Sequence, residues 1–508
     1  MNIVLLLEMA ADAAPDRVAV GDRYVGLTTT ELLDLSRRAA ARIAASGADR
    51  VVYTDVSGPA LPVALFGAAA AGVPFVPLNY RLADDRLRGL VARQAPALLL
   101  CGAGTEHRTS DLAGVEQVTT DGFLASLAPV EPATGTGVHD PDAVAVLLHT
   151  SGTSGEPKVA VLRHRHLAGY VLGSVEFLGA GDDEASLVSV PPYHIAAVSA
   201  LLTSVYGGRR IVQLPDFEPA SWVEVAREQR VTHAMTVPTM LARILDALEA
   251  FAGPADAGAT GLPYLRNLSY GGGRMPLPVI ERALALVPGV DFVNAYGLTE
   301  TSSSIALLSP DEHREAFASD DPLVRQRLSS VGRPLPTVEI SVRDPDGHEL
   351  PPGERGEIWV RGEQVSGEYT HRDGGATGGW FATRDRGWFD GGGYLYVEGR
   401  IDDVIVRGGE NLSPGEIEDV LLTHPAVAEA VVLGLPDDEW GEVVAAVVVL
   451  HPGAAATPGE LSDWVVARLR SSRRPAVVEV RAELPYNDTG KVLRRVVRAE
   501  LLAQASAA

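Results

Sequence analysis

Several segments of this chain combine small, hydroxyl-bearing and charged residues in a way that suits phosphate chemistry. The first, HTSGTSGEPKVAV, spans 149–161 and directly follows an apolar run at 143–148. Small residues let successive backbone N–H groups converge on an anion, and Lys158 adds a positive charge. Because two residues separate the last glycine from the lysine, the segment is not the Walker A loop of P-loop kinases and ATPases. The alternative is a flexible linker, but a linker rarely follows a buried strand and carries Pro and Lys before another apolar run.

The segment NAYGLTET, at 294–301, also follows a predicted strand. Tyr296 offers a flat face to a purine, Gly297 permits close approach, and Thr299 supplies a hydroxyl. The carboxylate of Glu300 suits Mg²⁺, a hard cation that favours oxygen ligands. Taken alone, Tyr296 is equally explained as a packed aromatic residue, and Thr299 with Glu300 as the start of a helix.

Three weaker segments add glycines, a carboxylate, an arginine and a lysine. The glycines of YGGGR, at 270–274, form either a loose turn or a floor for adenosine. Asp385, in WFATRD, can accept both hydroxyls of a ribose, and Arg400 can clamp the same sugar or its phosphate. Their alternatives are a solvated turn residue and a surface ion pair worth about 0–1 kcal/mol. Lys491, in LPYNDTGKV, would ordinarily be a solvent-exposed lysine in a polar turn, and it becomes a candidate site residue only because the other segments occur in the same chain.

The elements that must position these residues form two patterns. From about 50 to 310, short β-type runs alternate with helical stretches, which predicts parallel sheets covered by helices. Ligands of such sheets gather at the carboxyl ends of the strands, where the segments above lie. The expected strands are 143–148, 186–190, 210–214, 232–236, 265–269 and 291–294, and the expected helices include 222–229 and 239–251.

The pattern changes near residue 330. Short strands at 338–342, 357–360 and 394–397, separated by Pro/Gly turns, predict an antiparallel or barrel-like part. A compact segment of roughly a hundred residues follows Arg400, a size that suits a small separate domain. We expect in it helices at 414–423 and near 459–469, and strands at 429–433 and 443–450. The predicted boundary lies at 400–402.

Composition excludes several classes of protein. A chain of 508 residues is expected to hold two or more cores, and its net charge of −23 argues against partners such as nucleic acid or anionic lipid. One cysteine, Cys101, builds no disulfide framework and is expected to be a buried small hydrophobe. The N-terminus lacks the basic start of a secretion signal, and the longest apolar stretch, 63–76, is shorter than the ~20 residues of a membrane span. We therefore expect a soluble, cytoplasmic protein.

In this order and spacing, the segments resemble the core motifs of the ANL superfamily of adenylate-forming enzymes, which includes acyl- and aryl-CoA synthetases. The resemblance extends over nearly the whole chain and includes 27–82. It implies an α/β fold with a large N-terminal domain of parallel subdomains and a small barrel-like part at 1–399. A hinge at 400–402 and a mobile α+β C-terminal domain at 403–508, which carries Lys491, complete the implied organisation.

Residue by residue, the resemblance implies a phosphate loop made of Thr150, Ser151, Gly152, Thr153, Ser154, Gly155 and Lys158. It implies an adenine site lined by Gly271, Gly272, Gly273, Asn294, Ala295, Tyr296 and Gly297. Thr299 would contact the α-phosphate, Glu300 would bind Mg²⁺, and Asp385 with Arg400 would hold the ribose. Lys491 would bridge carboxylate and phosphate, and Asp402 matches the hinge position. Gly408 and Gly409 would approach the pantetheine arm of coenzyme A, and His194 would lie between acyl pocket and thiol tunnel, unless it is a satisfied core histidine.

The chemistry explains these residue types. A carboxylate must attack the α-phosphate of ATP, so cations and oriented N–H groups are needed to offset the repulsion between two anions. A moving domain would then bring a thiol to the site. We expect coenzyme A as acceptor. The expected acid is of modest size, either aromatic and polar-substituted or a fatty acid of moderate length, in a pocket that includes Tyr270 and Ser302; a homodimer is allowed.

Three alternatives differ in testable ways. One keeps adenylation but uses a carrier-protein phosphopantetheine, an amine or another nucleophile as acceptor. A non-catalytic nucleotide-binding protein would be expected to have lost Lys158, Glu300 or Lys491, and the sequence keeps all three. The third alternative is a P-loop kinase or ATPase, and the absence of a Gly-Lys-Ser/Thr loop from this sequence counts against it. One departure from the family pattern is Arg384, which stands where a glycine is usual and removes the freedom to adopt a positive φ.

Overall fold

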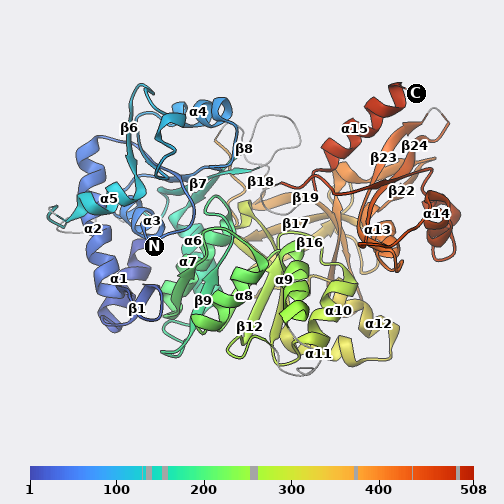
Figure 1. Ribbon diagram of the computed structural model, residues 1–508, viewed down its shortest axis with the longest axis horizontal. Coiled ribbons are helices and arrows are strands. Elements are labelled where there is room, and N and C mark those ends of the chain that lie inside the picture. Colours follow the sequence, from blue (N-terminus) through green and yellow to red (C-terminus); the bar gives the residue numbers. More distant parts are fainter. Residues whose placement is uncertain are drawn as a thin grey trace.

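The computed structural model describes residues 1–128, 130–132, 140–150, 158–251, 261–370, 376–437, 439–487 and 492–507. Within these ranges the strands form four sheets, of six, nine, five and five strands, with helices packed on them (Figure 1). Three sheets belong to the large N-terminal part and the fourth to a small C-terminal part. The predicted α/β class, with a large domain of parallel sheets and a small C-terminal α+β domain, is confirmed.

The six-stranded sheet has the order β6-β5-β3-β4-β7-β8. Its paired strands run parallel, except that β7 and β8 are antiparallel. Continuous apolar runs such as β5, which is buried along its whole length, are typical of parallel strands covered on both faces. The strands are β3 (Val51–Thr54), β4 (Phe75–Pro77), β5 (Ala97–Cys101), β6 (Val115–Thr119), β7 (Val144–Thr150) and β8 (Lys158–Arg163), and the helices are α2 (Thr29–Ser46), α3 (Ala60–Ala71), α4 (Asp84–Ala92), η1 (Glu106–Arg108) and α5 (Thr120–Leu127).

The nine-stranded sheet has the order β15-β14-β13-β12-β11-β9-β10-β1-β2. Strands β10, β9, β11, β12 and β13 are parallel, so their carboxyl ends share one edge. The sheet comprises β1 (Val18–Gly21), β2 (Gly26–Thr28), β9 (Ala185–Val188), β10 (Arg210–Gln213), β11 (His233–Thr236), β12 (Asn267–Gly271), β13 (Asp291–Leu298), β14 (Ser303–Leu308) and β15 (Arg333–Pro334). The predicted strands agree within a few residues, but β13 continues through 295–298 because it pairs with β14.

The remaining helices of the large N-terminal part pack on its sheets through shared apolar clusters. Apolar residues of α8, α9 and α10 share one core cluster with Leu187, Leu268 and Phe292 of the sheet. The helices α1 and α7 join another cluster, which extends to α2 and α3. The elements are α1 (Val4–Ala13), α6 (His164–Ser174), α7 (Ile195–Gly207), α8 (Pro219–Glu228), α9 (Pro238–Phe251), α10 (Leu277–Leu286), η2 (Thr299–Thr301), α11 (Pro310–Ala318), α12 (Pro322–Arg325) and η3 (Gln326–Ser329).

The third sheet is antiparallel, as the change of pattern near residue 330 predicted. It comprises β16 (Val338–Arg343), β17 (Gly356–Gly362), β18 (Ala376–Thr377), β19 (Trp380–Phe389) and β20 (Leu395–Arg400). Its last strand ends at Arg400, the short helix η4 (Ile401–Asp403) follows, and the first strand of the fourth sheet begins at Ile405. The chain therefore passes from the third sheet to the fourth between Arg400 and Ile405, and the domain boundary and hinge expected at 400–402 stay predictions.

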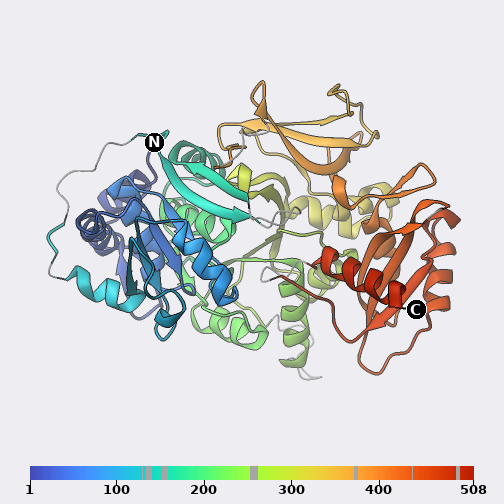
Figure 2. The same cartoon turned by 90° about the horizontal axis from the view of Figure 1, so that it is seen from above.

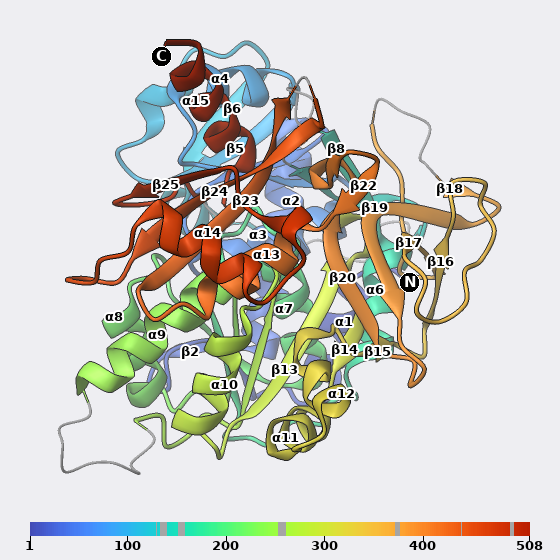
Figure 3. The same ribbon diagram turned by 90° about the vertical axis from the view of Figure 1, so that its right-hand side faces the viewer.

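The small C-terminal part packs helices on a mixed sheet, β22-β21-β24-β23 with β25 beside β24 (Figures 2 and 3). Its elements are β21 (Ile405–Arg407), β22 (Glu410–Leu412), α13 (Pro414–Leu422), β23 (Val427–Asp437), β24 (Gly441–Leu450), α14 (Pro458–Val466), η5 (Ser471–Arg473), β25 (Val477–Arg481) and α15 (Arg494–Ala507). It has its own apolar clusters, one of which joins α13 and α14 to β23 and β24. Across the described parts of the chain, no helix has the length and apolar character needed to cross a lipid bilayer.

Candidate active site

Tyr296, Asp385 and Arg400 form one polar group, which we call the Asp385 cluster. The phenol of Tyr296, near the end of β13, donates a hydrogen bond of 2.7 Å to Oδ2 of Asp385 on β19. The guanidinium Nε of Arg400, at the end of β20, lies 3.1 Å from Oδ1 of the same carboxylate. Asp385 is buried, and β19 pairs with β20 so that Asp385 lies opposite Arg400. The cluster thus joins the second sheet to the third.

The electrostatics of this cluster keep the phenol of Tyr296 protonated and the guanidinium of Arg400 charged. Burial raises the pKa of Tyr296 well above its usual range, and the nearby Asp385 carboxylate raises it further, so the phenol stays a donor. Burial by itself would lower the pKa of Arg400, but the charges of Asp385 and Glu300 outweigh it and raise the pKa. Arg400 therefore stays a cation beside the carboxylate of Asp385.

Glu300, Tyr369 and Lys158 form a second group, the Glu300 cluster. Glu300 lies in η2, directly after β13, and its buried carboxylate accepts a hydrogen bond of 2.6 Å from the phenol of Tyr369. The ammonium of Lys158, at the start of β8, lies 5.4 Å from the centre of the Tyr369 ring. Tyr369 also forms an isolated β-bridge with Ala160. Burial, followed by the charge of Glu300, raises the pKa of Tyr369.

Arg400 interacts electrostatically with Glu300 and Tyr369 as well as with Asp385 and Tyr296, so the two clusters lie near one another. Residues from three sheets, which are far apart in the sequence, therefore surround one polar region. Tyr369 was missed by sequence reasoning, since a single tyrosine in the segment SGEYTHRDGG carries no pattern that marks it. Thr299 adjoins Glu300 in η2, and Thr150 lies opposite Lys158 across the β7–β8 pair.

The predicted adenine residues lie at the adjoining carboxyl ends of β12 and β13. Gly271 lies opposite Ala295, and a Cβ added at Gly271 would lie 2.2 Å from the carbonyl oxygen of Ala295. The absence of a side chain at Gly271 is therefore explained by strand packing. Gly272 and Gly273 follow in the turn, and Asn294 is buried with its amide donating to the carbonyl of Ser330 at 2.9 Å. Gly297 lies further along β13.

Two residues of the expected acid pocket have other roles. The hydroxyl of Tyr270 bonds to Nε2 of His313 at 2.7 Å, and its side chain is fully buried in the cluster that includes α10. The hydroxyl of Ser302, which is also fully buried, donates to the carbonyl of Gln364 at 2.9 Å. These hydroxyls serve the protein's own packing, and the expectation that they line the acid pocket is replaced by this finding.

His194 is the N-cap residue of α7, and its ring lies 4.8 Å from that of Tyr193. Tyr193 in turn contacts Tyr80 edge-on at 5.8 Å, so aromatic side chains gather next to the predicted histidine. Gly408 and Gly409 form the turn between β21 and β22 in the small domain, where the Gly408 amide donates to the carbonyl of Trp440 at 2.7 Å. The roles of these residues toward acid and thiol stay predictions.

Some predicted site residues lie outside the described residues. These are most of the phosphate loop, Ser151, Gly152, Thr153, Ser154 and Gly155, and the predicted catalytic lysine, Lys491. The described chain on either side of Lys491 pairs with itself, through a bridge between Tyr486 and Val492.

Arg384 has a positive φ of 63°, although it is not glycine, so the expectation that arginine abolishes this conformation is wrong. The cause is a bulge: the register between β17 and β19 shifts next to Arg384. A residue in the left-handed region is common at such bulges. The Arg384 guanidinium does not add a cation to the carboxylate of Asp385; it pairs with Oδ1 of Asp402 at 2.9 Å.

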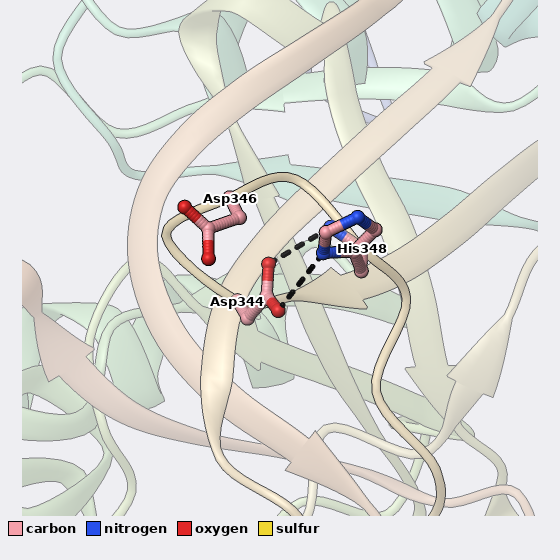
Figure 4. A group of neighbouring side chains, drawn as sticks. All are labelled: Asp344, Asp346 and His348. Atoms are coloured by element: carbon pink, nitrogen blue, oxygen red, sulfur yellow. Dashed lines mark hydrogen bonds and ion pairs between the residues drawn. The ribbon is translucent and has the colours of Figure 1, made fainter.

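In the described residues, a group of potential metal ligands also occurs away from the Glu300 cluster. Asp344, Asp346 and His348 lie in the turn between β16 and β17, with ligand atoms within 4.8 Å of one another (Figure 4). Asp344 accepts a hydrogen bond of 2.8 Å from the backbone of His348 and lies 3.3 Å from its ring. These contacts are those of a tight exposed turn, and they account for the group without a metal.

Comparison with protein families agrees with this geometry. The family described as AMP-binding enzyme matches residues 7–370, and its C-terminal domain family matches residues 416–491. The chain belongs to the AMP-binding enzyme family. The stated resemblance to adenylate-forming enzymes is thereby confirmed, and the predicted enzyme class, an AMP-forming acid–CoA ligase that uses ATP and Mg²⁺, is confirmed at the level of the family.

Among similar proteins is a feruloyl-CoA synthase from Amycolatopsis, 32% identical over 497 residues, with 96% of each chain covered. The fatty acid–[acyl-carrier-protein] ligase ScoC from Streptomyces coeruleorubidus is also 32% identical, covering 93% of this chain and 91% of its own. The indoleacetate–CoA ligase of Aromatoleum aromaticum is 30% identical and is covered to 98%, as is this chain.

Two solved structures have the same architecture. The o-succinylbenzoate CoA synthetase of Bacillus subtilis, in complex with its acyl-adenylate intermediate, is 31% identical with a TM-score of 0.82, and 97% of each chain is covered. MatB from Rhodopseudomonas palustris, 27% identical, covers 98% of this chain and 99% of its own. Its ATP-bound structure gives a TM-score of 0.86 and its apo structure 0.76.

Proposed function

We propose that the protein activates an aromatic carboxylic acid with ATP as an acyl-adenylate and transfers the acyl group to the thiol of coenzyme A. The observation that carries this proposal is the convergence of the Asp385 and Glu300 clusters from three sheets onto one polar region. A site with two carboxylates, two cations and adjoining glycine-rich strand ends suits a ribose, phosphates and a metal ion together.

In this reaction the acid's carboxylate oxygen attacks the α-phosphorus of ATP and pyrophosphate leaves. Asp385 accepts the ribose hydroxyls, because a carboxylate has more acceptor positions than Tyr296 and Arg400 occupy. Arg400 and Lys158 offset the negative charge that two anions bring together. The oxygens of Glu300, with the Thr299 hydroxyl beside them, fit Mg²⁺, which when bound would neutralise phosphate charge.

Lys491 would bridge the acid and the α-phosphate in this step. The small domain, 403–508, then turns about 400–402 relative to 1–399, so that Lys491 leaves and the turn at Gly408 and Gly409 approaches with the thiol. The thiol sulfur attacks the acyl carbon, and AMP leaves with the electron pair of the broken bond. This division into two steps is supported by the separate sheet on which the small domain is built.

Support for an aromatic acid comes from two sides. The feruloyl-CoA synthase and the indoleacetate–CoA ligase act on acids with aromatic rings, and the identity to each is spread over the whole chain. Tyr80, Tyr193 and His194 form a contiguous aromatic cluster, and aromatic rings of this kind make edge-on or stacked contacts with the ring of a ligand.

A carrier-protein thiol is the second candidate acceptor, because the ligase ScoC resembles this chain as closely as the feruloyl-CoA synthase does. Both acceptors present the same phosphopantetheine thiol, so they differ in what the protein recognises beyond it. The net charge of −23 disfavours an acidic carrier protein, since like charges repel on approach.

The test is to incubate the protein with ATP, Mg²⁺ and either an aromatic acid or an aliphatic acid of similar size. Thioester is then measured with coenzyme A and with a phosphopantetheinylated carrier protein. We expect acid-dependent pyrophosphate release and a CoA thioester with the aromatic acid. Pyrophosphate release without any CoA thioester would reject coenzyme A, and release independent of any acid would reject the proposal.

The variant Lys491→Ala separates the two steps. We expect a loss of adenylation of about a thousandfold, as when a group that acts in the transition state is removed, and near-normal thioester formation from supplied acyl-adenylate. Equal loss of both steps would contradict the division of labour between them.

A further inference from the structure

Arg274 connects the large domain to the small one. It follows Gly273 in the turn after β12, and its guanidinium forms an ion pair with Oδ2 of Asp419 on α13. Both side chains are about one third exposed, at 36% and 31%. The pair is therefore partly shielded from water, unlike the fully exposed pairs that contribute little to stability.

Gly415 of α13 makes room for this contact. A Cβ added at Gly415 would lie 1.9 Å from Nη1 of Arg274, closer than any packing allows. Gly415 and Asp419 are four residues apart on one helix and so lie on the same face, one turn from each other. In the first two turns of α13, the missing side chain of Gly415 leaves a notch that receives the guanidinium of Arg274, and the carboxylate of Asp419 pairs with that guanidinium.

The same helix contacts the large domain a second time. The hydroxyl of Ser413, the N-cap residue of α13, donates to the carbonyl of Glu398 on β20 at 3.2 Å. Ser413 and Asp419 are separated by about 9 Å along the helix, at 1.5 Å per residue. Two contacts at this spacing fix the direction of α13 against the large domain, whereas one alone would leave it free to pivot.

Of the two contacts between α13 and the large domain, the ion pair of Arg274 with Asp419 contributes more than the hydrogen bond of Ser413, because it compensates a charge. Burial raises the pKa of Asp419 to about 6, the Arg274 cation opposes this, and the carboxylates of Glu418 and Glu416 add to it. Without Arg274, a carboxylate would remain among acidic neighbours at a partly buried interface. Removing one member of such a pair is costly because the other is stranded, whereas changing both is much cheaper.

We propose that Arg274 is a positioning residue that holds the small domain in the arrangement seen here, in which the acid reacts with ATP. This inference rests on the proposed function. The agreement of the whole chain with ATP-bound MatB, higher than with apo MatB, supports an arrangement that suits a bound nucleotide. Since Arg274 directly follows the glycines 271–273, it links the predicted adenine site to the orientation of the domain that carries Lys491.

The first test compares the two half-reactions in the full-length protein. Arg274→Ala is expected to slow acid-dependent ATP–pyrophosphate exchange about tenfold, while thioester formation from supplied acyl-adenylate and coenzyme A changes less than about twofold. Arg282→Ala is the matched control, because Arg282 is 34% exposed and pairs with Asp246 and Glu249 inside the large domain. It should leave both rates unchanged.

The second test uses the notch. Gly415→Ala favours the helix by about 1 kcal/mol in the absence of other effects, so a merely helical role predicts a more stable protein with normal exchange. If Arg274 occupies the notch, Gly415→Ala slows exchange as Arg274→Ala does. Adding Gly415→Ala to Arg274→Ala then has no further effect, because the clashing side chain is gone. Arg274→Ala with Asp419→Asn should recover part of the lost exchange.

The outcomes distinguish this inference from the proposed function. A wild-type protein without acid-dependent exchange counts against the proposed function. A wild-type protein with exchange, and an Arg274→Ala variant that either matches it or loses both half-reactions equally, overturns the positioning role. If Arg274→Ala does not fold, Arg274→Gln and the Gly415→Ala variant provide the same comparison.

Discussion

The phenol of Tyr296 on β13 donates a hydrogen bond of 2.7 Å to the carboxylate of Asp385 on β19, 89 residues further along the chain. This bond joins the strand that ends in the NAYGLTET segment to the sheet that carries Arg400. It also fixes one oxygen of a carboxylate whose other oxygen faces Arg400. If Asp385 binds the ribose as proposed, its orientation therefore depends on Tyr296.

Tyr296→Phe removes this hydrogen bond and keeps the ring. A hydrogen bond to a charged group is worth about 1.5–3 kcal/mol, so we expect the KM for ATP to rise roughly tenfold or more. The rate at saturating ATP should fall less, because Arg400 still contacts Asp385. Steady-state kinetics at varied ATP measures both. Tyr24→Phe, at a side chain that is 72% exposed, is the control; an unchanged KM in Tyr296→Phe would contradict the role of Asp385.

Glu300→Gln tests the proposed Mg²⁺ site. The amide can still accept the hydrogen bond from Tyr369, but it lacks the charge that a hard divalent cation favours. We expect the Mg²⁺ concentration for half-maximal pyrophosphate release to rise by about tenfold or more. Tyr369→Phe, which keeps the carboxylate, should change it much less. A larger effect of Tyr369→Phe than of Glu300→Gln would show that the Glu300 cluster is structural.

Arg384→Gly tests the departure from the family pattern. Glycine relieves a left-handed conformation that costs about 1–2 kcal/mol, loses an exposed ion pair worth about 0–1 kcal/mol, and adds entropy to the unfolded chain worth about 0.4–1 kcal/mol. These effects nearly cancel, so we expect a change in unfolding free energy below about 1 kcal/mol and an ATP KM within about twofold of wild type. Arg384→Ala, which keeps the strained φ, should be the less stable variant. A large rise in KM for Arg384→Gly would show that the arginine acts on the nucleotide.

Stability should fall in mild acid because of buried histidines such as His313. Burial lowers the pKa of His313 from its ordinary value to about 4. In the unfolded chain this histidine is protonated as the pH falls below about 6.5, whereas in the folded protein it stays neutral until about pH 4. The free energy of unfolding therefore decreases as the pH falls from 6.5 toward 4. His313→Gln should show a smaller drop in Tm between pH 7 and pH 5 than wild type. The exposed His107 provides the control, His107→Gln; an equal drop in all three would contradict the account.

The sequence predicted local elements well because their causes are local. The predicted nucleotide-binding segments at 149–161, 270–274 and 294–301 each follow an apolar run, and β7, β9, β10, β11 and β12 lie where such runs predicted them. The pairing of Tyr296 with Asp385 and of Glu300 with Tyr369 depends on how separate sheets pack, which periodicity does not encode.

Other features escaped prediction for equally physical reasons. The positive φ of Arg384 follows from a register shift between β17 and β19, and no residue type announces it. The contact of Arg274 with Asp419 depends on the docking of two domains. Tyr270 and Ser302 carry hydroxyls that could line a pocket, but these hydroxyls form hydrogen bonds with His313 and with the carbonyl of Gln364.

The central claim is that loops from both domains surround one nucleotide, and the two lysines of the chain offer a direct test. Lys158 begins β8 at the end of the large domain's predicted phosphate loop, and Lys491 precedes α15 in the small domain. An amine-acetylating reagent therefore has only these two side chains and the N-terminus to modify. Mass spectrometry after brief labelling, with and without ATP and Mg²⁺, measures each site separately. We predict that ATP protects Lys158 and Lys491 together while the N-terminus is labelled equally in both samples. Protection of neither lysine, or of one alone at saturating ATP, would contradict the shared nucleotide site.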